Sequence, residues 1–187
     1  MENERLIDLR RTQFLILNAS VIVVFSAVIV AIALDVTLAE FTFVVAILTL
    51  IQSALYFVKG KSFSEVFSKK MNELMTYEKE RMGAEWRKQR RTNAIMQLFL
   101  GAVFLSNSIF LYDDEMYADV ANLFPYMFYF LLGLMVLINV TTFVHNRKVD
   151  RNKIKKGYTL RTFLLSLIVG LVIVSIVNFV VLTTILD

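Results

Sequence analysis

Cysteine is absent from this 187-residue chain, and histidine and proline each occur only once. Without cysteine there are no disulfides, thiolate metal sites or cysteine nucleophiles. The single histidine, His145, has no second histidine or cysteine with which to share a metal, and we expect it to lie as a cation at a helix C-terminus, reaching water. The G-x-S-x-G, H-E-x-x-H and P-loop patterns are also missing, so we expect neither enzymatic activity nor a cofactor.

Charged residues are scarce, at 19% of the chain, whereas hydrophobic residues make up 57%. Soluble domains average roughly 25% charged and 45–50% apolar residues, so this balance indicates an integral membrane protein. A membrane crossing needs roughly 20 apolar residues in helical conformation. Five stretches are long and apolar enough, and they cover residues 13–34, 38–58, 92–112, 121–144 and 162–186.

The expected fold is all-α, a polytopic helical bundle of about five transmembrane helices that forms a single membrane domain over residues 1–187. Helices are favoured because a bilayer leaves unpaired backbone groups unsatisfied, and the apolar stretches lack the alternation of a membrane β-barrel. None of the five stretches contains Lys, Arg or Asp. Ion-coupled transporters place ionisable groups within the membrane, so this absence argues against a coupled transporter.

Positive charge is confined to three parts of the chain. Residues 1–12 hold three Lys and Arg residues, residues 59–91 hold ten and residues 145–161 hold seven, which accounts for all 20 in the protein. With five crossings, these three parts lie on one side, and the positive-inside rule makes that side the cytoplasm. We therefore expect a multi-pass protein of the cell membrane, with a cytoplasmic N-terminus and an extracytoplasmic C-terminus.

The longest segment between apolar stretches, residues 59–91, is predicted to be a cytoplasmic helical segment. Residues 63–77 show a helical period with one broad apolar face. This segment either lies flat in the membrane interface, with Trp86 as an anchor, or extends the third transmembrane helix into the cytosol. In both arrangements its apolar face either covers the protein's own end or binds a partner. The predicted partner-binding residues are Phe63, Phe67, Met71, Leu74 and Trp86.

Three further sets of residues are candidates for contacts. Asn107 and Asn139 are the most deeply placed amides of the apolar stretches and are predicted to hydrogen-bond between helices. The acidic turn with Asp113, Asp114 and Glu115 could hold a hard cation, although a solvated outer loop explains it as well. Because the basic residues flank apolar stretches and no nucleic-acid motif is present, anionic lipid is their expected partner. The candidate lipid contacts are Arg87, Lys88, Arg90, Arg91, Lys155 and Lys156.

Taken together, these observations favour a non-enzymatic membrane protein that forms homo-oligomers. It would engage a cytosolic or membrane partner through its cytoplasmic helix, as accessory, immunity, sensing or defence proteins do. The alternative is a homo-oligomeric ion channel or pore, in which the acidic outer turns would attract cations and the neutral polar side chains would line the path. We expect membrane lipids, other copies of the chain and a cytosolic protein as partners, and no nucleic acid.

Overall fold

The computed structural model describes residues 3–110, 120–151, 154–170 and 172, and within these ranges the protein is helical and has no strands. Four helices are long and apolar enough to cross a membrane, namely Asn3–Ala33, Ala39–Lys59, Ala84–Phe110 and Phe128–Asp150. A shorter apolar helix, Tyr158–Gly170, follows them. The all-helical membrane fold is therefore confirmed. The expected fifth span, residues 162–186, is described only in its first part, and its remainder lies outside the described residues.

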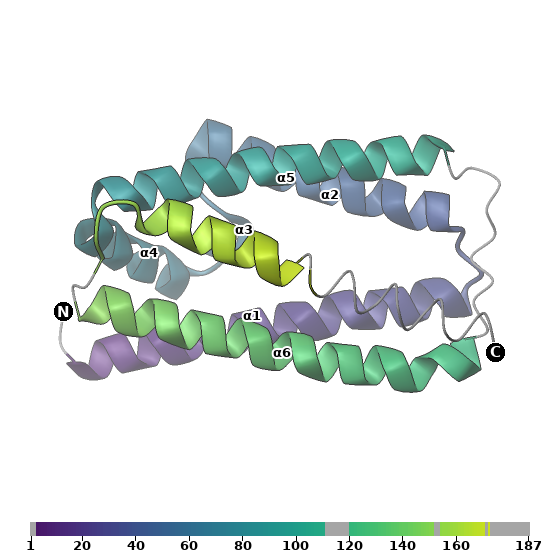
Figure 1. Cartoon of the computed structure of the whole chain (residues 1–187), viewed down its shortest axis with the longest axis horizontal. Helices are drawn as coiled ribbons and strands as arrows, with labels where there is room; N and C mark the ends of the chain where they lie inside the picture. The colour runs from purple at the N-terminus through teal and green to yellow at the C-terminus, as the bar shows by residue number, and fades with distance from the viewer. Residues whose placement is uncertain (1–2, 111–119, 152–153, 171, 173–187) are drawn as a thin grey trace.

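The long helices form two antiparallel pairs (Figure 1). In one pair, α2 (Leu38–Lys59) packs along α5 (Ala84–Phe110), and in the other, α1 (Asn3–Ala33) lies beside α6 (Val120–Asp150). The helix Tyr158–Gly170 lies between the pairs in this view. Two short helices, α3 (Phe63–Phe67) and α4 (Lys69–Met82), lie near the end where the chain begins.

Local sequence explains where the second long helix starts and stops. Thr37 and Glu40 form a capping box at the start of α2, in which the Thr37 side chain accepts from the Glu40 N–H and the Glu40 carboxylate accepts from the Thr37 N–H. At its other end, Gly60 adopts a left-handed conformation with φ of 63°. Between these ends, a Cβ atom added at Gly101 of α5 would lie 2.8 Å from the Leu50 side chain, so the glycine permits close packing of the pair.

The helical segment predicted over residues 63–77 is interrupted. Ser68 has an extended backbone, with φ of −124° and ψ of 115°, and it ends α3 and caps α4. Its hydroxyl accepts a hydrogen bond of 3.3 Å from the Met71 N–H, which offers the backbone an alternative to a continuous helix. The prediction that Phe63, Phe67, Met71 and Leu74 share one helical face is therefore wrong.

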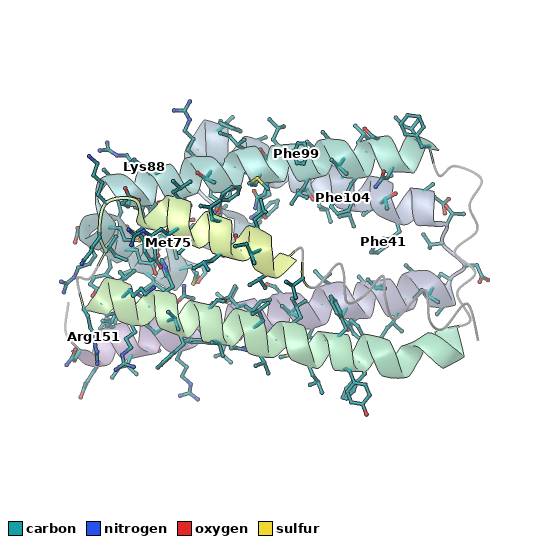
Figure 2. The ribbon with its side chains drawn as sticks, viewed as in Figure 1. Phe41, Met75, Lys88, Phe99, Phe104 and Arg151 are labelled. Atoms are coloured by element: carbon teal, nitrogen blue, oxygen red, sulfur yellow. The ribbon has the colours of Figure 1, made fainter. Side chains whose placement is uncertain are left out.

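The second predicted arrangement, an extension of the third span, is correct only for part of the segment. α4 ends at Gly83, which has φ of 56°, and α5 begins at Ala84. The charged residues 84–91 thus continue the third span, whereas α4 is a separate helix that contacts α1, α5 and α6. Figure 2 shows the polar end, where Lys88 and Arg151 lie, and the apolar stretch marked by Phe99, Phe104 and Phe41.

The three basic parts of the chain meet at this end, which we call the basic end and define as the described residues 3–12, 59–91, 145–151 and 154–161. Arg5 of α1 pairs with Glu73 of α4 at 2.5 Å, and Arg10 of α1 pairs with Asp150 of α6 at 2.8 Å. The turn from Asp35 to Thr37 lies at the opposite end (Figure 1). The expectation that all three basic parts share one side therefore agrees with the arrangement of the helices.

Candidate functional site at the basic end

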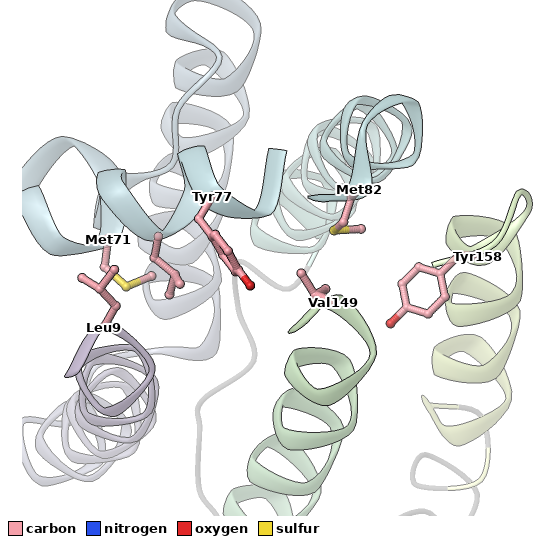
Figure 3. Close-up of a cluster of buried hydrophobic side chains, with 7 residues drawn as sticks. Leu9, Met71, Tyr77, Met82, Val149 and Tyr158 are labelled. Carbon is pink, nitrogen blue, oxygen red and sulfur yellow. The ribbon is translucent and has the colours of Figure 1, made fainter. Parts of the chain in front are cut away.

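α4 packs its apolar face on the protein's own helices. Met71 and Leu74 are buried beside Leu9 of α1, and Tyr77 and Met82 continue the same face toward the other helices (Figure 3). Val149 of α6 and Tyr158 of the last helix complete this cluster. Leu9 and Leu74 are fully buried, and burying a side chain of this size contributes about 1.5–3 kcal/mol relative to exposure. The cluster therefore joins α4 to both α1 and α6.

A buried charged cluster lies next to the apolar one. Arg10 of α1 pairs with Glu78 of α4, and its other terminal nitrogen pairs with Asp150 of α6 at 2.8 Å. Only 10% of the Arg10 side chain and 5% of the Glu78 side chain are exposed. Gln13 accepts hydrogen bonds from Arg10 at 3.2 Å and from Asn146 at 2.9 Å. Three helices are thus fixed to one another by one arginine.

His145 joins this cluster to the last helix. Its Nε2 atom lies 4.0 Å from the Glu78 carboxylate, and its Nδ1 atom shares a hydrogen bond of 2.9 Å with the Tyr158 hydroxyl. Burial alone would raise the pKa of Glu78, but contact with His145 and the charge of Arg10 outweigh it and hold this pKa below its usual 4.5. The expectation that His145 reaches out to water is wrong, because its ring is half-buried between Glu78 and Tyr158.

Glu85 at the start of α5 fixes the beginning of the last helix. Its carboxylate accepts hydrogen bonds from the backbone N–H groups of Thr159, at 3.0 Å, and Gly157, at 3.3 Å. The Thr159 hydroxyl donates to the Glu85 carbonyl oxygen at 3.1 Å. Lys88 lies 3.0 Å from the same carboxylate. A helix N-terminus carries unpaired N–H groups and partial positive charge, so Glu85 acts as a cap supplied by another helix.

Arg90 of α5 holds the short helix α3. It forms an ion pair of 2.5 Å with Glu65, and the Glu65 carboxylate also accepts from the Ser62 N–H at 3.0 Å. The Arg90 guanidinium lies 4.5 Å from the centre of the Trp86 ring and 5.3 Å from that of Tyr56. The predicted lipid contact at Arg90 is therefore replaced by an internal ion pair, with only 14% of the side chain exposed.

Beside Arg90, between the end of α2 and the first turns of α5, lies a cavity of about 440 Å³. Tyr56 and Gly60 line it from α2, and Trp86 and Arg90 line it from α5. Arg87 and Arg91 also line it, and both are exposed. In the part of the chain that the structure describes, neither of these two arginines forms an ion pair or a hydrogen bond. The cavity, which we call the α2–α5 pocket, is therefore aromatic and positively charged.

Within the apolar region, one polar contact joins α1 to α6. Asn18 donates to the Asn139 side-chain oxygen at 3.1 Å, and Asn139 donates back to Asn18 at 2.8 Å. The prediction that Asn139 hydrogen-bonds between helices is thus met by a partner in α1. Asn107 is exposed on α5, and within the described residues its side chain has no hydrogen bond. Its predicted packing role stays a prediction.

The other predicted site residues lie apart from one another. Phe63 is half-buried and its ring stacks on that of Phe67 at 6.3 Å, while Phe67 itself is 82% exposed. Lys155 and Lys156 are exposed in the turn before the last helix. Asp113, Asp114 and Glu115 lie outside the described residues. Among the residues that are described, no group of His, Asp and Glu side chains is arranged to hold a metal ion.

The sequence analysis did not single out the residues that hold the basic end together, which are Arg10, Glu78, Glu85, Asp150 and Tyr158, nor Asn18, the partner of Asn139 in the apolar region. One signal was available for Glu78. It follows Met71 by seven residues and Leu74 by four, so it falls on the apolar face of α4, where a carboxylate requires a buried partner.

Comparison with known proteins adds no further residues, because no family model matches the chain and neither a curated protein nor a solved structure resembles it significantly.

We predict that Asn139→Leu lowers the thermal stability of the detergent-solubilised protein slightly, because it removes both hydrogen bonds to Asn18. Interhelical polar contacts in membranes average about 0.6 kcal/mol and reach about 1.7 kcal/mol, so the loss should be partial. The matched control is Asn107→Leu, which replaces an exposed amide by the same side chain. Equal melting temperatures for the two variants would contradict the prediction.

A second prediction concerns Glu78→Gln, which leaves the buried Arg10 with one carboxylate fewer. Removing the partner of a buried ion pair costs about 3–5 kcal/mol where the remaining charge is left unpaired, and the loss here should be smaller because Arg10 keeps Asp150, so the variant should melt at a lower temperature at pH 7. Because the folded-state pKa of Glu78 lies below 4.5, the wild-type advantage is complete above pH 4.5 and is lost as the pH falls through that lower pKa.

Circular dichroism melts of the two proteins, taken from pH 7 downward, measure this advantage. Glu73→Gln is the control, since Glu73 also pairs with an arginine of α1 but lies at the surface. It should change the melting temperature little. A Glu78 variant that melts like the Glu73 variant would show that the buried cluster contributes nothing to stability.

Proposed function

We propose that this protein is a non-enzymatic multi-pass protein of the cell membrane that acts by binding another protein at its cytoplasmic surface. The observation that carries the proposal is that the two short helices differ in exposure. α4 is occupied by internal contacts, whereas α3 presents the 82% exposed ring of Phe67. Of the two short helices that carry predicted partner-binding residues, α3 is therefore the one available to a partner. An accessory, sensing, immunity or defence role is consistent with such a surface.

The orientation follows from the charge distribution. The basic end holds every Lys and Arg residue that the structure describes, and the positive-inside rule favours the cytoplasm for it. A reporter fused after Asp187 should then report an extracytoplasmic position, and one inserted at Lys70 a cytoplasmic one. If both report the same side of the membrane, the number of spans is even and the five-span topology is wrong, whereas two reversed reports would contradict the orientation.

The surroundings of Phe67 indicate the kind of partner. Lys61 and Lys69 flank α3, both are exposed, and neither forms an ion pair within the described part of the chain. Two copies meeting through this surface would bring like charges together, which disfavours self-association at this place. We therefore propose a partner that carries an apolar pocket surrounded by acidic residues. Homo-oligomers would instead form through the lipid-facing sides of the long helices.

To test this, a photo-reactive amino acid replaces Phe67 in living cells. The expected product is an adduct with one defined protein, which disappears when Lys61→Glu and Lys69→Glu are introduced together. The matched control places the same amino acid at Leu74, whose side chain is fully buried and should give internal adducts only. Adducts with lipid alone, or adducts insensitive to charge reversal, would contradict the proposed protein partner.

A companion pair of variants separates the contact from the fold. Phe67→Glu charges an exposed ring and should leave the melting temperature unchanged, while Leu74→Glu places a carboxylate in the apolar cluster and should lower it strongly. Loss of cellular function in Phe67→Glu, with the protein inserted and folded, would place the function on α3. Single-channel recordings of the purified protein in planar bilayers address the alternative of an ion channel.

A further inference from the structure

The α2–α5 pocket begins where the close packing of its two helices ends. The Ser53 hydroxyl of α2 donates to the Ala94 carbonyl of α5 at 2.9 Å. One turn further toward the basic end, Tyr56 and Phe57 of α2 already line the pocket. α2 stops at Lys59, and a Cβ atom added at Gly60 would meet no atom within 4 Å. The pocket thus lies at the end of α2, with side chains of the last turn of that helix in its wall.

The charges around the pocket are unequally compensated. Arg90 is neutralised by Glu65 and is held against Trp86 and Tyr56, so it acts as part of the wall. The second nearby acid, Glu85 of α5, forms an ion pair with Lys88 and accepts a hydrogen bond from the start of the last helix. Arg87 and Arg91 lie one helical turn apart, line the same pocket and have no acidic partner in the described residues. They leave two positive charges at its mouth.

The pocket also lies at a defined depth along the helices. Apolar residues of α2 run up to Val58, and those of α5 follow Arg91, so the pocket occupies the boundary between apolar span and basic end. At this boundary in a bilayer lie the phosphate groups of the lipids, where aromatic and basic side chains are enriched. Guanidinium groups bind phosphate oxygens in a bidentate manner, which an ammonium group does less well.

We propose that the α2–α5 pocket binds the phosphate of an anionic phospholipid, with Arg87 and Arg91 as its ligands and Trp86 and Tyr56 as its wall. The acyl chains would continue along the exposed apolar side chains of the same pair, such as Phe57 on α2 and Ile95 and Leu98 on α5. This site does not depend on the protein partner proposed for α3, because it uses different residues and a different ligand.

The chain supplies its own reporter, since Trp86 is its only tryptophan and lines the pocket. Detergent-solubilised full-length protein is titrated with phosphatidylglycerol that carries bromine atoms on its acyl chains, and quenching of tryptophan fluorescence is recorded. Brominated phosphatidylcholine provides the neutral comparison. We expect saturable quenching by phosphatidylglycerol, at concentrations where phosphatidylcholine has little effect.

Arg87→Gln with Arg91→Gln should weaken phosphatidylglycerol binding by about tenfold or more, because it removes the guanidinium groups that contact the phosphate directly. Lys155→Gln with Lys156→Gln removes the same charge from the same end but outside the pocket, where salt screens its attraction for the phosphate, and should change the affinity by less than about twofold. Circular dichroism melts confirm that both double variants remain folded.

Two results would overturn the proposal. Equal losses in the two double variants would mean that lipid follows the overall charge of the basic end and not the pocket. Displacement of the brominated lipid by millimolar inorganic phosphate would show that the pocket takes a soluble anion in place of a lipid. Selective loss in the arginine variant, with no displacement by phosphate, supports a lipid site.

Discussion

The arrangement of the basic end depends on the burial of one positive charge. Arg10 lies on α1 shortly before its apolar stretch, residues 13–34, and its guanidinium is enclosed between α1, α4 and α6. A buried charge is tolerated only where opposite charges and hydrogen bonds compensate it. Glu78 and Asp150 provide this compensation from two different helices. The position of α4 is therefore set by a requirement for charge balance as well as by its apolar face.

Within the described residues, the contacts along the apolar parts of the long helices involve small or uncharged polar residues and no buried charge. α2 and α5 pack closely because Gly101 and Ala94 are small, and α1 and α6 share the Asn18–Asn139 pair. Water-driven burial does not act between helices in lipid, and interhelical polar contacts there are weak. The apolar cluster around Leu74, in contrast, forms at the basic end, where α4 adds a face that would otherwise meet water. The two pairs are thus connected most firmly at their basic end.

Hydropathy and charge were enough to predict the helical membrane fold, the presence of the first four apolar helices and the gathering of basic residues at one end, because each depends on local composition. The helices themselves extend beyond the predicted spans, as α1 does toward Asn3 and α5 toward Ala84. The break at Ser68 was not predicted, since the apolar period of residues 63–77 continues across it and a serine cap competes only locally with the helix. The pairings of Arg10 with Glu78 and of Glu85 with Thr159 join residues 68 and 74 positions apart. No periodicity in one sequence specifies such partners.

The basic residues that orient a membrane protein are not equivalent to one another here. One group forms ion pairs with carboxylates and contributes to the fold. Arg10 pairs with Glu78 of α4, Arg90 pairs with Glu65 of α3, and Lys88 pairs with Glu85, which caps the last helix. Arg87, Arg91, Lys155 and Lys156 have no such partners in the described chain and face outward. An orientation signal needs only charge near the membrane, whereas an internal ion pair needs a particular geometry. Because acids neutralise the first group, the second group leaves net positive charge at the basic end. Within the described residues Arg87 and Arg91 combine that charge with a pocket, and this combination is the reason for proposing them as the ligands of a lipid phosphate.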